Sequence, residues 1–302
     1  MLAGTNILIA GGFVPGAELS STYLMKIDFE NEENKIKDVR FRMLPDYPTP
    51  FYFACFGNYC YRSLIMGGFK SNGQCFEFHQ DKYFSMPSLK SCRSGAASTS
   101  IYDKLLVTGG YGDYEILQKM KYFDSIEILD LIETNTPPTW IEYPSALPYK
   151  VWGHSLVTLN EKLFLIGGDL EDTGRCDLIW QGCVDTKTNT IEWNEMGIHL
   201  KNKRSCHFSF VISDSIIVFG GSDVDDDVVE IIQGDTIKSG PPSPSGLSSF
   251  KDQAVLDRSG RIIITSNTYD CFILYDYQNE TFTHYPNAKP LDNRNFYVAL
   301  VQ

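Results

Sequence analysis

One short pattern, an apolar run that ends in two glycines, recurs along this chain and constrains its fold more than any other feature. A sixth run, Ile262–Asn267, keeps the apolar residues but carries Ser266 and Asn267 in place of the glycines. Asparagine tolerates the left-handed backbone better than most residues, so we expect the strand end to persist there. The five complete runs are Ile7–Gly12, Leu64–Gly68, Leu105–Gly110, Leu163–Gly168 and Ile216–Gly221.

The intervals between these runs close into a circle. Counted between first glycines, with Ser266 as the sixth marker, they are 56, 42, 58, 53 and 46 residues. The interval from Ser266 through the chain end to Gly11 is 47 residues, which lies within the range of the others. A self-similar pattern at such a period indicates an array of repeated structural units. Six units therefore account for all 302 residues.

Each unit has the pattern of four short strands. One strand precedes the glycine strand, as in Trp152–Val157 and Ser205–Val211, and an aromatic or β-branched strand that ends near an Asp follows it. A polar turn then leads to a short strand with a large aromatic residue. Short strands of this composition, separated by turns, predict an all-β chain. The aromatic residues at the fourth strands are Phe84, Trp140, Trp193 and Phe282.

The double glycines, the spaced tryptophans and the Arg-x-x-His sequence at Arg204–His207 resemble the kelch-repeat family. The resemblance covers essentially the full length, although the sixth unit lacks the glycines and units one, two, five and six lack the Trp. Kelch repeats build β-propellers, in which radial repetition protects the sheet edges. The resemblance therefore implies an all-β, six-bladed β-propeller of four-stranded antiparallel blades.

We expect a single propeller domain over residues 1–302. The first unit starts at its second strand, so its inner strand is predicted at 295–301, where the C-terminal strand pairs in the N-terminal blade and closes the ring. The approximate blades are 1–45 plus 294–302, 50–87, 93–144, 151–196, 204–239 and 249–286.

Composition excludes several classes of protein. The formal charge of −12 argues against a nucleic-acid binder, and no apolar run reaches the roughly 18 to 20 residues of a membrane span. The start of the chain lacks the basic segment of a signal peptide. We therefore expect a cytoplasmic protein with no nucleic-acid or membrane partner.

The eight cysteines are scattered, without the spacing of a disulfide framework or a zinc finger, which favours reduced thiols. One disulfide bridge is left as an alternative, because a two-residue turn at Gly57–Asn58 would place Cys55 opposite Cys60 on the neighbouring strand. Glycosylation of the sequon at Asn279 also stays open.

The strand order predicts where a ligand binds. The segment that leads into each inner strand and the loop after each double glycine emerge on one face, because those two strands are antiparallel. In kelch propellers this face, around the mouth of the central channel, is the usual ligand site. We call the residue 16 positions before each marker the lead-in residue. The expected lead-in residues are Phe51, Arg93, Val151, Arg204 and Phe250, with Arg294 in the first unit.

A basic and aromatic channel mouth follows from these positions. Guanidinium groups pair with carboxylates and phosphates through two parallel hydrogen bonds, so the arginines are either a clamp for an acidic or phosphorylated ligand or structural donors to neighbouring loops. The post-glycine loops farther out predict an acidic rim. The predicted ligand-binding residues are Phe51, Tyr52, Arg93, Trp152, Arg204, Lys251 and Arg294, and the rim residues are Asp113, Asp169, Asp172, Asp225 and Asp226.

Metal binding and catalysis have weaker support. The run Asp223–Asp227 lacks the alternating ligands and the bidentate Glu of a calcium loop. His154 and His207 occupy matching positions in adjacent units, where a bond to the neighbouring blade fits better than a shared metal. No phosphate-binding glycine loop, GxSxG or HExxH motif occurs. We expect no cofactor, no metal and no catalytic residue.

The sequence thus predicts a non-catalytic module that binds a protein or peptide at the mouth face, for substrate recognition or scaffolding. The kelch resemblance implies ubiquitin-ligase or cytoskeletal partners. Cullin adaptors of this kind carry BTB and BACK domains, which these residues do not include, so a fragment and a stand-alone propeller both stay open. The alternative is a propeller enzyme that acts on a sugar, as kelch-type copper oxidases and sialic-acid mutarotases do.

Overall fold

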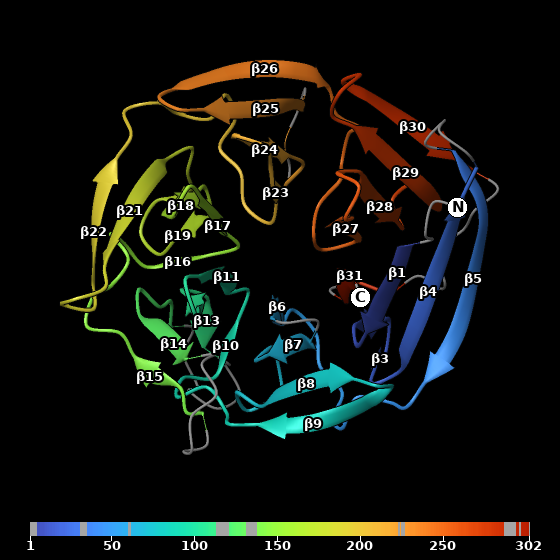
Figure 1. The fold of residues 1–302 in the computed structure, drawn as a ribbon, viewed down its shortest axis with the longest axis horizontal. Coiled ribbons are helices and arrows are strands. Elements are labelled where there is room, and N and C mark those ends of the chain that lie inside the picture. The colour runs from blue at the N-terminus through green and yellow to red at the C-terminus, as the bar shows by residue number, and fades with distance from the viewer. Residues whose placement is uncertain are drawn as a thin grey trace.

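Six four-stranded antiparallel sheets stand around a central axis and form a ring of blades (Figure 1). The computed structural model describes residues 5–30, 35–59, 62–112, 121–130, 138–222, 224, 227–286, 294–295 and 297–301. These residues form strands and turns, and none of them is helical. No helix in the described part of the chain is long and apolar enough to span a membrane. The predicted all-β propeller is confirmed.

Each blade runs from an inner strand at the channel to an outer strand at the rim (Figure 1). Blade 1 consists of β31 (Val298–Val301), β1 (Thr5–Ala10), β4 (Thr22–Phe29) and β5 (Ile36–Leu44). Blade 2 consists of β6 (Cys55–Tyr59), β7 (Arg62–Met66), β8 (Cys75–His79) and β9 (Lys82–Met86). Blade 3 consists of β11 (Ala97–Ile101), β12 (Lys104–Thr108), β14 (Ile126–Asp130) and β15 (Ile141–Glu142).

The second half of the chain repeats this arrangement. Blade 4 consists of β17 (Ser155–Leu159), β18 (Lys162–Ile166), β21 (Ile179–Asp185) and β22 (Thr190–Glu195). Blade 5 consists of β23 (Phe208–Ile212), β24 (Ser215–Phe219), β25 (Val228–Gln233) and β26 (Thr236–Pro242). Blade 6 consists of β27 (Asp252–Leu256), β28 (Ile262–Ser266), β29 (Cys271–Asp276) and β30 (Thr281–Tyr285). Short strands pair in the loops: β2 (Phe13–Val14), β3 (Ala17–Glu18), β10 (Arg93–Ser94), β13 (Tyr111–Gly112), β16 (Val151–Trp152), β19 (Asp169–Leu170) and β20 (Gly174–Arg175).

The ring closes through the C-terminal strand, as predicted. Strand β31 pairs antiparallel with β1, with Ile7 opposite Val301 and Ala10 opposite Val298. The Thr5 hydroxyl also donates to the Asp257 carboxylate of blade 6 at 3.0 Å. The two ends of the chain are therefore held in one sheet and tied to the preceding blade.

The hydrophobic core is divided into six clusters, one between each pair of neighbouring blades. Between blades 6 and 1, Ile7 and Met25 pack with Ile263 and Phe272. This arrangement buries both faces of the middle strands, so that all five residues of β24 are buried. Because each of these clusters joins two neighbouring blades, stability is shared among the six interfaces.

The aromatic residues of the outer strands follow the predicted repeat in part. Trp140 is buried, and its Nε1 donates to the Pro87 carbonyl of the preceding blade at 3.0 Å. Trp193 packs on the cluster between blades 3 and 4 but stays half-buried. In blade 2 the inward position belongs to Tyr83, whereas Phe84 is 42% exposed. The expected placement of Phe84 was one residue off, which moves a strand side chain to the opposite face.

The predicted turn at Gly57–Asn58 is wrong. Both residues lie inside β6, and Cys55 is opposite Met66 in the ladder with β7. The thiol of Cys55 donates to the Met66 carbonyl at 3.3 Å, and burial raises its pKa to about 12. Cys60 lies outside the described residues. The geometric basis for a Cys55–Cys60 bridge is therefore lost.

Candidate functional site

The double glycines form the contact between neighbouring blades at the mouth face. The N–H of the second glycine donates to the carbonyl of the next blade's lead-in residue, as Gly110 does to Val151 at 2.8 Å. A Cβ on the first glycine, Gly109, would lie 2.6 Å from the same carbonyl oxygen. Only glycine permits this approach, and its φ of +59° also favours glycine. The other lead-in carbonyls bonded in this way belong to Phe51, Arg93, Arg204 and Leu247.

The expected lead-in residue of blade 6 was Phe250, and the structure corrects it to Leu247. Five residues lie between Leu247 and Gln253, which pairs with the residue before Ser266. The other blades have three residues between the lead-in residue and the equivalent strand position, as between Arg93 and Ala97, so blade 6 has two extra residues. The extra residues form a turn in which the Asp252 N–H donates to the Ser248 carbonyl at 2.9 Å. This turn displaces Phe250 from the lead-in position.

Blade 6 replaces the glycine contact with side chains. Asn267 donates from Nδ2 to the Arg294 carbonyl, which identifies Arg294 as the lead-in residue of blade 1. The Ser266 hydroxyl donates to Asp252 at 2.8 Å, and the Thr268 N–H donates to the same carboxylate at 3.1 Å. The sixth unit therefore keeps the junction without glycines.

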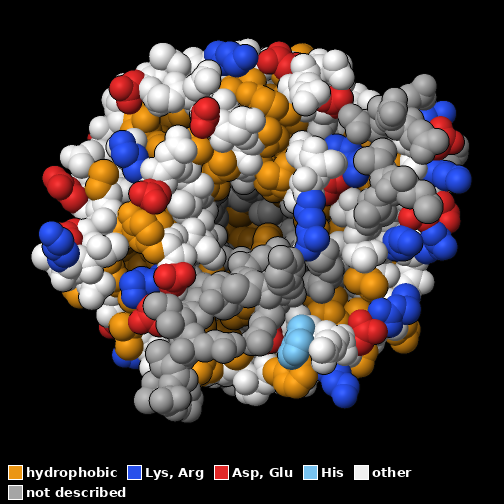
Figure 2. Space-filling model, viewed as in Figure 1, with side chains coloured by type: hydrophobic (Ala, Val, Ile, Leu, Met, Phe, Trp, Pro, Cys, Tyr) orange, Lys and Arg blue, Asp and Glu red, His pale blue; other side chains and the backbone are white. Residues whose placement is uncertain are grey.

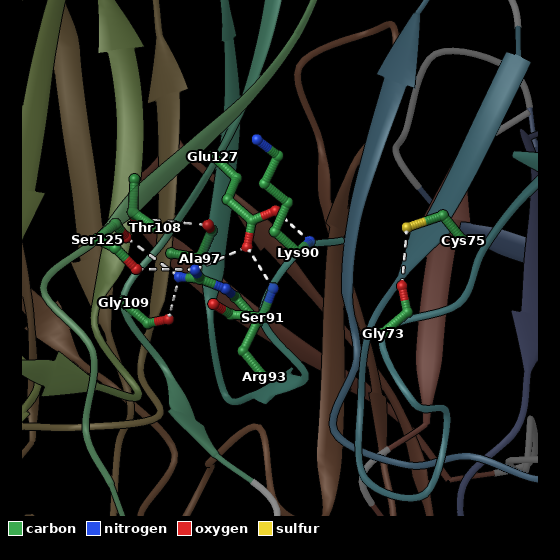
Figure 3. Close-up of polar contacts among 10 residues, drawn as sticks. All are labelled: Gly73, Cys75, Lys90, Ser91, Arg93, Ala97, Thr108, Gly109, Ser125 and Glu127. Carbon is green, nitrogen blue, oxygen red and sulfur yellow. Dashed lines mark hydrogen bonds and ion pairs between the residues drawn. The ribbon is translucent and has the colours of Figure 1, made fainter. Parts of the chain in front are cut away.

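The three lead-in arginines are buried, and this overturns the predicted clamp. Arg93 is 1% exposed and donates to the Gly109 carbonyl at 2.8 Å, to Ser125 Oγ at 2.9 Å and to Glu127 at 2.8 Å (Figure 3). Glu127 also accepts hydrogen bonds from the backbone N–H groups of Lys90 and Ser91. The Arg93 guanidinium thus connects the carbonyl of Gly109, the first glycine of blade 3, to Glu127. Glu127 in turn holds the backbone of Lys90 and Ser91, in the segment that leads into blade 3.

Arg204 and Arg294 repeat this arrangement. Arg204 is fully buried and donates to the Gly220 carbonyl at 2.7 Å, to Asp227 at 2.8 Å and to Glu230 at 2.6 Å. Arg294 is 2% exposed and donates to the Gly11 and Ser21 carbonyls at 2.8 and 3.2 Å. A buried guanidinium with these partners is not available to a ligand, so all three arginines are structural.

The sequence contains a feature that points to this structural role of the arginines and that the prediction of a clamp did not use. Glu127 and Glu230 interrupt otherwise apolar third strands at the same register, opposite Val107 and Val218. Both belong to blades whose lead-in residue is Arg. In blade 1 the equivalent position, opposite Ile9, holds Tyr23, whose ring lies 5.3 Å from the Arg294 guanidinium. In blades 3 and 5 the acid in the third strand therefore predicts the direction of the lead-in arginine, whereas in blade 1 an aromatic ring takes the place of the acid.

The other predicted ligand residues separate into buried and accessible ones. Phe51 is fully buried in the cluster between blades 1 and 2, so its predicted ligand contact is wrong. Tyr52 is half-buried on the mouth face, where its ring stacks on Phe69 at 4.9 Å and lies 5.8 Å from Phe13. Lys251 is exposed.

Three aromatic side chains from alternate blades meet across the channel axis. Phe53 leads into blade 2, Trp152 into blade 4 and Phe250 into blade 6, and we call these three residues the aromatic plug. Their ring centroids are separated by 5.8 Å for Phe53 and Trp152, 5.6 Å for Phe53 and Phe250, and 6.2 Å for Trp152 and Phe250. Tyr111 and Tyr122 extend the group outward, at 5.4 and 6.4 Å from Trp152.

A chain of backbone hydrogen bonds narrows the channel beside the aromatic plug. Gly95 donates to Phe53 at 3.0 Å, Gly153 to Gly95 at 2.9 Å, Cys206 to Gly153 at 2.6 Å and Ser249 to Cys206 at 2.9 Å. Phe53 and Cys206 adopt φ values of +60° and +54°, which L side chains rarely adopt. This chain links blades 2 to 6 and fixes the positions of the aromatic plug.

The predicted acidic rim is described only in part. Asp172 is exposed, and Asp169 is half-buried beside Arg175 in the register of β19 and β20. Burial raises the pKa of Asp169, and the Arg175 charge opposes that shift. Asp113, Asp225 and Asp226 lie outside the described residues.

The central channel encloses about 460 Å³ and is lined by the inner strands of the blades. Figure 2 shows a hollow at the centre of the ring, with hydrophobic side chains in its depth. His154 and His207 line this channel, and each bonds to the blade before it: His154 Nε2 lies 2.9 Å from Thr108 Oγ1, and His207 Nε2 lies 2.9 Å from Ser155 Oγ.

Both histidines are neutral near physiological pH. Burial lowers the pKa of His154 to about 3, with a smaller effect of the Arg93 charge. Burial also lowers the pKa of His207 well below its usual value. No group of three or more His, Cys, Asp or Glu side chains that could hold a metal occurs among the described residues.

Comparisons with known proteins agree with this architecture. No family model matches the chain. Kelch domain-containing protein 3 of Bos taurus is 25% identical over 140 residues, which are 43% of this chain and 35% of the relative. The match therefore spans about a third of that relative. The solved structure of YjhT has a TM-score of 0.65 at 15% identity and covers 84% of this chain and 88% of its own. With the six sheets, the likeness to YjhT shows a β-propeller fold, and part of the chain is similar to a kelch domain-containing protein.

Proposed function

We propose that this propeller is a non-catalytic module that binds a protein or peptide on its mouth face. The observation that carries the proposal is the concentration of half-buried aromatic side chains on this face, around the aromatic plug and around Tyr52. Large, rigid aromatic side chains that are partly buried before binding supply contact area at little cost in conformational entropy, and they dominate binding hot spots.

Charged side chains surround these aromatic residues. Lys70 pairs with Glu18 at 2.9 Å and Lys150 with Glu171 at 2.7 Å, and Lys251 is exposed beside Phe250. A polar rim around an apolar centre is the usual anatomy of a protein interface. Because the three arginines are buried, the proposal no longer requires an acidic or phosphorylated partner.

The alternative, a propeller enzyme that acts on a sugar, needs an acid or base that can exchange a proton with its substrate. Of the described residues that line the channel, none is Asp, Glu, Lys or Arg. The two histidines there use Nε2 in bonds between blades, and burial lowers the pKa of each. These features favour binding over catalysis.

The test compares aromatic residues on the mouth face with aromatic residues elsewhere. Tyr52→Ala and Tyr122→Ala should each weaken the binding of a captured partner by at least about tenfold, as hot-spot truncations do. The controls Tyr102→Ala and Phe84→Ala remove exposed rings in the β11–β12 hairpin and in β9. These controls should leave the affinity unchanged in a titration of the purified partner. Loss of binding in the controls, with normal binding in the mouth variants, would place the interface elsewhere.

A further inference from the structure

The mouth face is asymmetric around the ring of blades. Each blade has two residues there, one directly after the lead-in residue and one directly after the second glycine or, in blade 6, after Asn267. In blades 1 to 4 at least one of the two residues is aromatic, whereas blade 5 has Ser205 and Ser222 and blade 6 has Ser248 and Thr268. Aromatic side chains therefore occupy these positions in four consecutive blades. The pairs in blades 1 to 4 are Asn295 with Phe13, Tyr52 with Phe69, Ser94 with Tyr111, and Trp152 with Asp169.

The rings at these positions contact one another in two groups. The ring centroid of Tyr52 lies 4.9 Å from that of Phe69 and 5.8 Å from that of Phe13. In the second group the ring centroids of Tyr111 and Trp152 are 5.4 Å apart. All the rings are half-buried, so each keeps part of its surface exposed to a partner. We call the following residues the aromatic arc: Phe13, Tyr52, Phe53, Phe69, Tyr111, Tyr122 and Trp152.

The backbone holds part of the aromatic arc in a strained conformation. Phe53 has a φ of +60°, at the position where blades 3 and 4 have Gly95 and Gly153, both with a φ of +61°. Lys70, directly after Phe69, has a φ of +63°. Bulky residues rarely adopt this conformation, and such strain is concentrated in segments that hold ligands. The rings are therefore fixed before a partner binds, which lowers the entropy cost of binding.

The charged side chains beside the aromatic arc already have partners within the chain. Lys70 pairs with Glu18 at 2.9 Å, and Lys150 pairs with Glu171 at 2.7 Å. A partner that bound through its own charges at these points would compete with the existing ion pairs. This arrangement favours a partner segment without charge.

The backbone beside the aromatic arc is engaged as well. The N–H groups of Phe13 and Phe69 donate to the carbonyls of Asn295 and Tyr52, both at 2.8 Å. Phe13 also pairs in the register of β2 and β3. Strand addition needs unpaired backbone groups at a sheet edge. Recognition at these residues therefore depends on the rings.

We propose that the aromatic arc binds a proline-rich segment in the polyproline II conformation. This inference rests on the proposed binding role of the mouth face and specifies the chemistry of the partner. Proline-rich segments dock on surfaces lined by aromatic rings, and they lose little entropy because they are extended before they bind. Their carbonyls have no internal partners. The Tyr122 phenol can donate to such a carbonyl, because burial raises its pKa and keeps it protonated.

Calorimetric titration with decaproline tests this assignment. The intact protein should give a saturable heat, whereas a Gly-Ser peptide of the same length is flexible and should give none. Because the contact is uncharged, the affinity should change by less than about twofold between about 50 mM and about 500 mM salt. A steep loss of affinity with salt would overturn the proposal, because it would show that charges dominate the contact.

Variants of one residue separate the ring from its apolar surface. Phe69→Leu keeps an apolar side chain but removes the ring, and it should weaken decaproline binding by at least about fivefold. Phe69→Tyr keeps the ring and should bind as the intact protein does. The matched control Phe84→Leu removes a ring that is 42% exposed on β9, and it should leave the affinity unchanged. Tyr111→Leu tests the blade 3 part of the arc independently, and urea unfolding shows which variants are folded.

Three further results would each overturn the proline preference: no saturable binding of decaproline, equal binding of the Gly-Ser peptide, or unchanged affinity in Phe69→Leu and Tyr111→Leu. The proposed function can fail separately. If a captured partner depends on Tyr52 and decaproline does not bind, the mouth interface stands and only this inference is overturned. If decaproline binding depends on Phe69 and the captured partner binds Tyr52→Ala normally, the arc is a proline site and the interface with that partner lies elsewhere.

Discussion

The lead-in positions of blades 3 and 5 and those of blades 2 and 4 share one backbone contact but differ in side-chain chemistry. Arg93 and Arg204 are buried with Glu127 and Glu230 in the third strand of their blades. At the corresponding positions, blade 4 has Val151 with Trp180, opposite Leu165, and blade 2 has Phe51 with Phe76, opposite Ile65. The double glycine of the preceding blade bonds to each lead-in carbonyl in the same way.

This difference shows that the backbone hydrogen bond between the double glycine and the lead-in carbonyl defines the junction between two blades. The lead-in side chain and the third-strand side chain of the same blade then only have to match each other in polarity. An arginine is tolerated because its charge and donors meet a carboxylate and the glycine carbonyl. An apolar lead-in residue is tolerated because its third-strand neighbour is apolar as well. A mixed pair should fail where the charged member loses its partners; blade 1 avoids this because Arg294 lies against the Tyr23 ring and donates to the Gly11 and Ser21 carbonyls.

The largest effect is expected from a mixed pair. Glu127→Leu leaves the Arg93 guanidinium buried without its carboxylate and removes the acceptor of the Lys90 and Ser91 N–H groups. Loss of one partner of a buried ion pair costs about 3 to 5 kcal/mol, a large part of a typical domain stability. Urea unfolding followed by tryptophan fluorescence measures the loss. The control Glu142→Leu, opposite Glu127 on exposed β15, should change the midpoint little. Equal midpoints for the two variants would contradict the structural role of the pair.

Acid should weaken the histidine junctions more than the others. The folded pKa of His154, about 3, and that of His207 lie below the unfolded value of about 6.5, so the unfolded chain binds more protons between these values. The contribution of the neutral histidines is complete above pH 6.5 and falls as the pH decreases below it. His154 should cost about 2 kcal/mol between pH 7 and pH 5, and His207 should lower the stability in the same direction. His154→Gln with His207→Gln should flatten the pH profile of unfolding; an unchanged profile would refute this assignment.

Exchanging the whole pair should restore much of the lost stability. Arg93→Val with Glu127→Trp copies the Val151 and Trp180 pair of blade 4 into blade 3. Replacing a buried ion pair by apolar residues is often close to neutral, although the N–H groups of Lys90 and Ser91 still lose their acceptor. We expect the double variant to regain at least about half of the loss caused by Glu127→Leu. A double variant less stable than Glu127→Leu would mean that the two chemistries are not interchangeable.

The smallest effect is expected at an exposed ion pair on the same face. Lys150 Nζ and Glu171 Oε2 are 2.7 Å apart, and the two side chains are 44% and 35% exposed to solvent. Water screens such pairs, and many contribute nothing measurable to stability. Lys150→Ala should therefore leave the urea midpoint unchanged at both low and high salt. A large loss would show that surface charge, rather than the buried pairs, stabilises the junctions.

Much of the architecture could be predicted from the repeats, but the site could be predicted only in part. The intervals between double glycines predicted six blades, and the missing strand of the first unit predicted the pairing of β31 with β1. The aromatic residues Tyr52 and Trp152 were placed on the accessible face, and Lys251 is exposed there. The three arginines and Phe51 were assigned to the wrong side of the same segment. The position of a lead-in residue in the sequence fixes where its backbone lies along the channel axis. It does not fix the direction in which the side chain points.

The sequence by itself determined the ring, because each glycine pair meets a local backbone requirement, a positive φ, that recurs in five of the six blades. Only the tertiary structure decided which side chains remain accessible. Arg93 meets a carboxylate 34 residues away, and Arg294 meets a carbonyl 283 residues away. The aromatic plug likewise depends on the two extra residues of blade 6, which move Phe250 out of the lead-in position. It also depends on the arrangement of three alternate blades around one channel axis. Such contacts depend on distances between segments that no local pattern encodes.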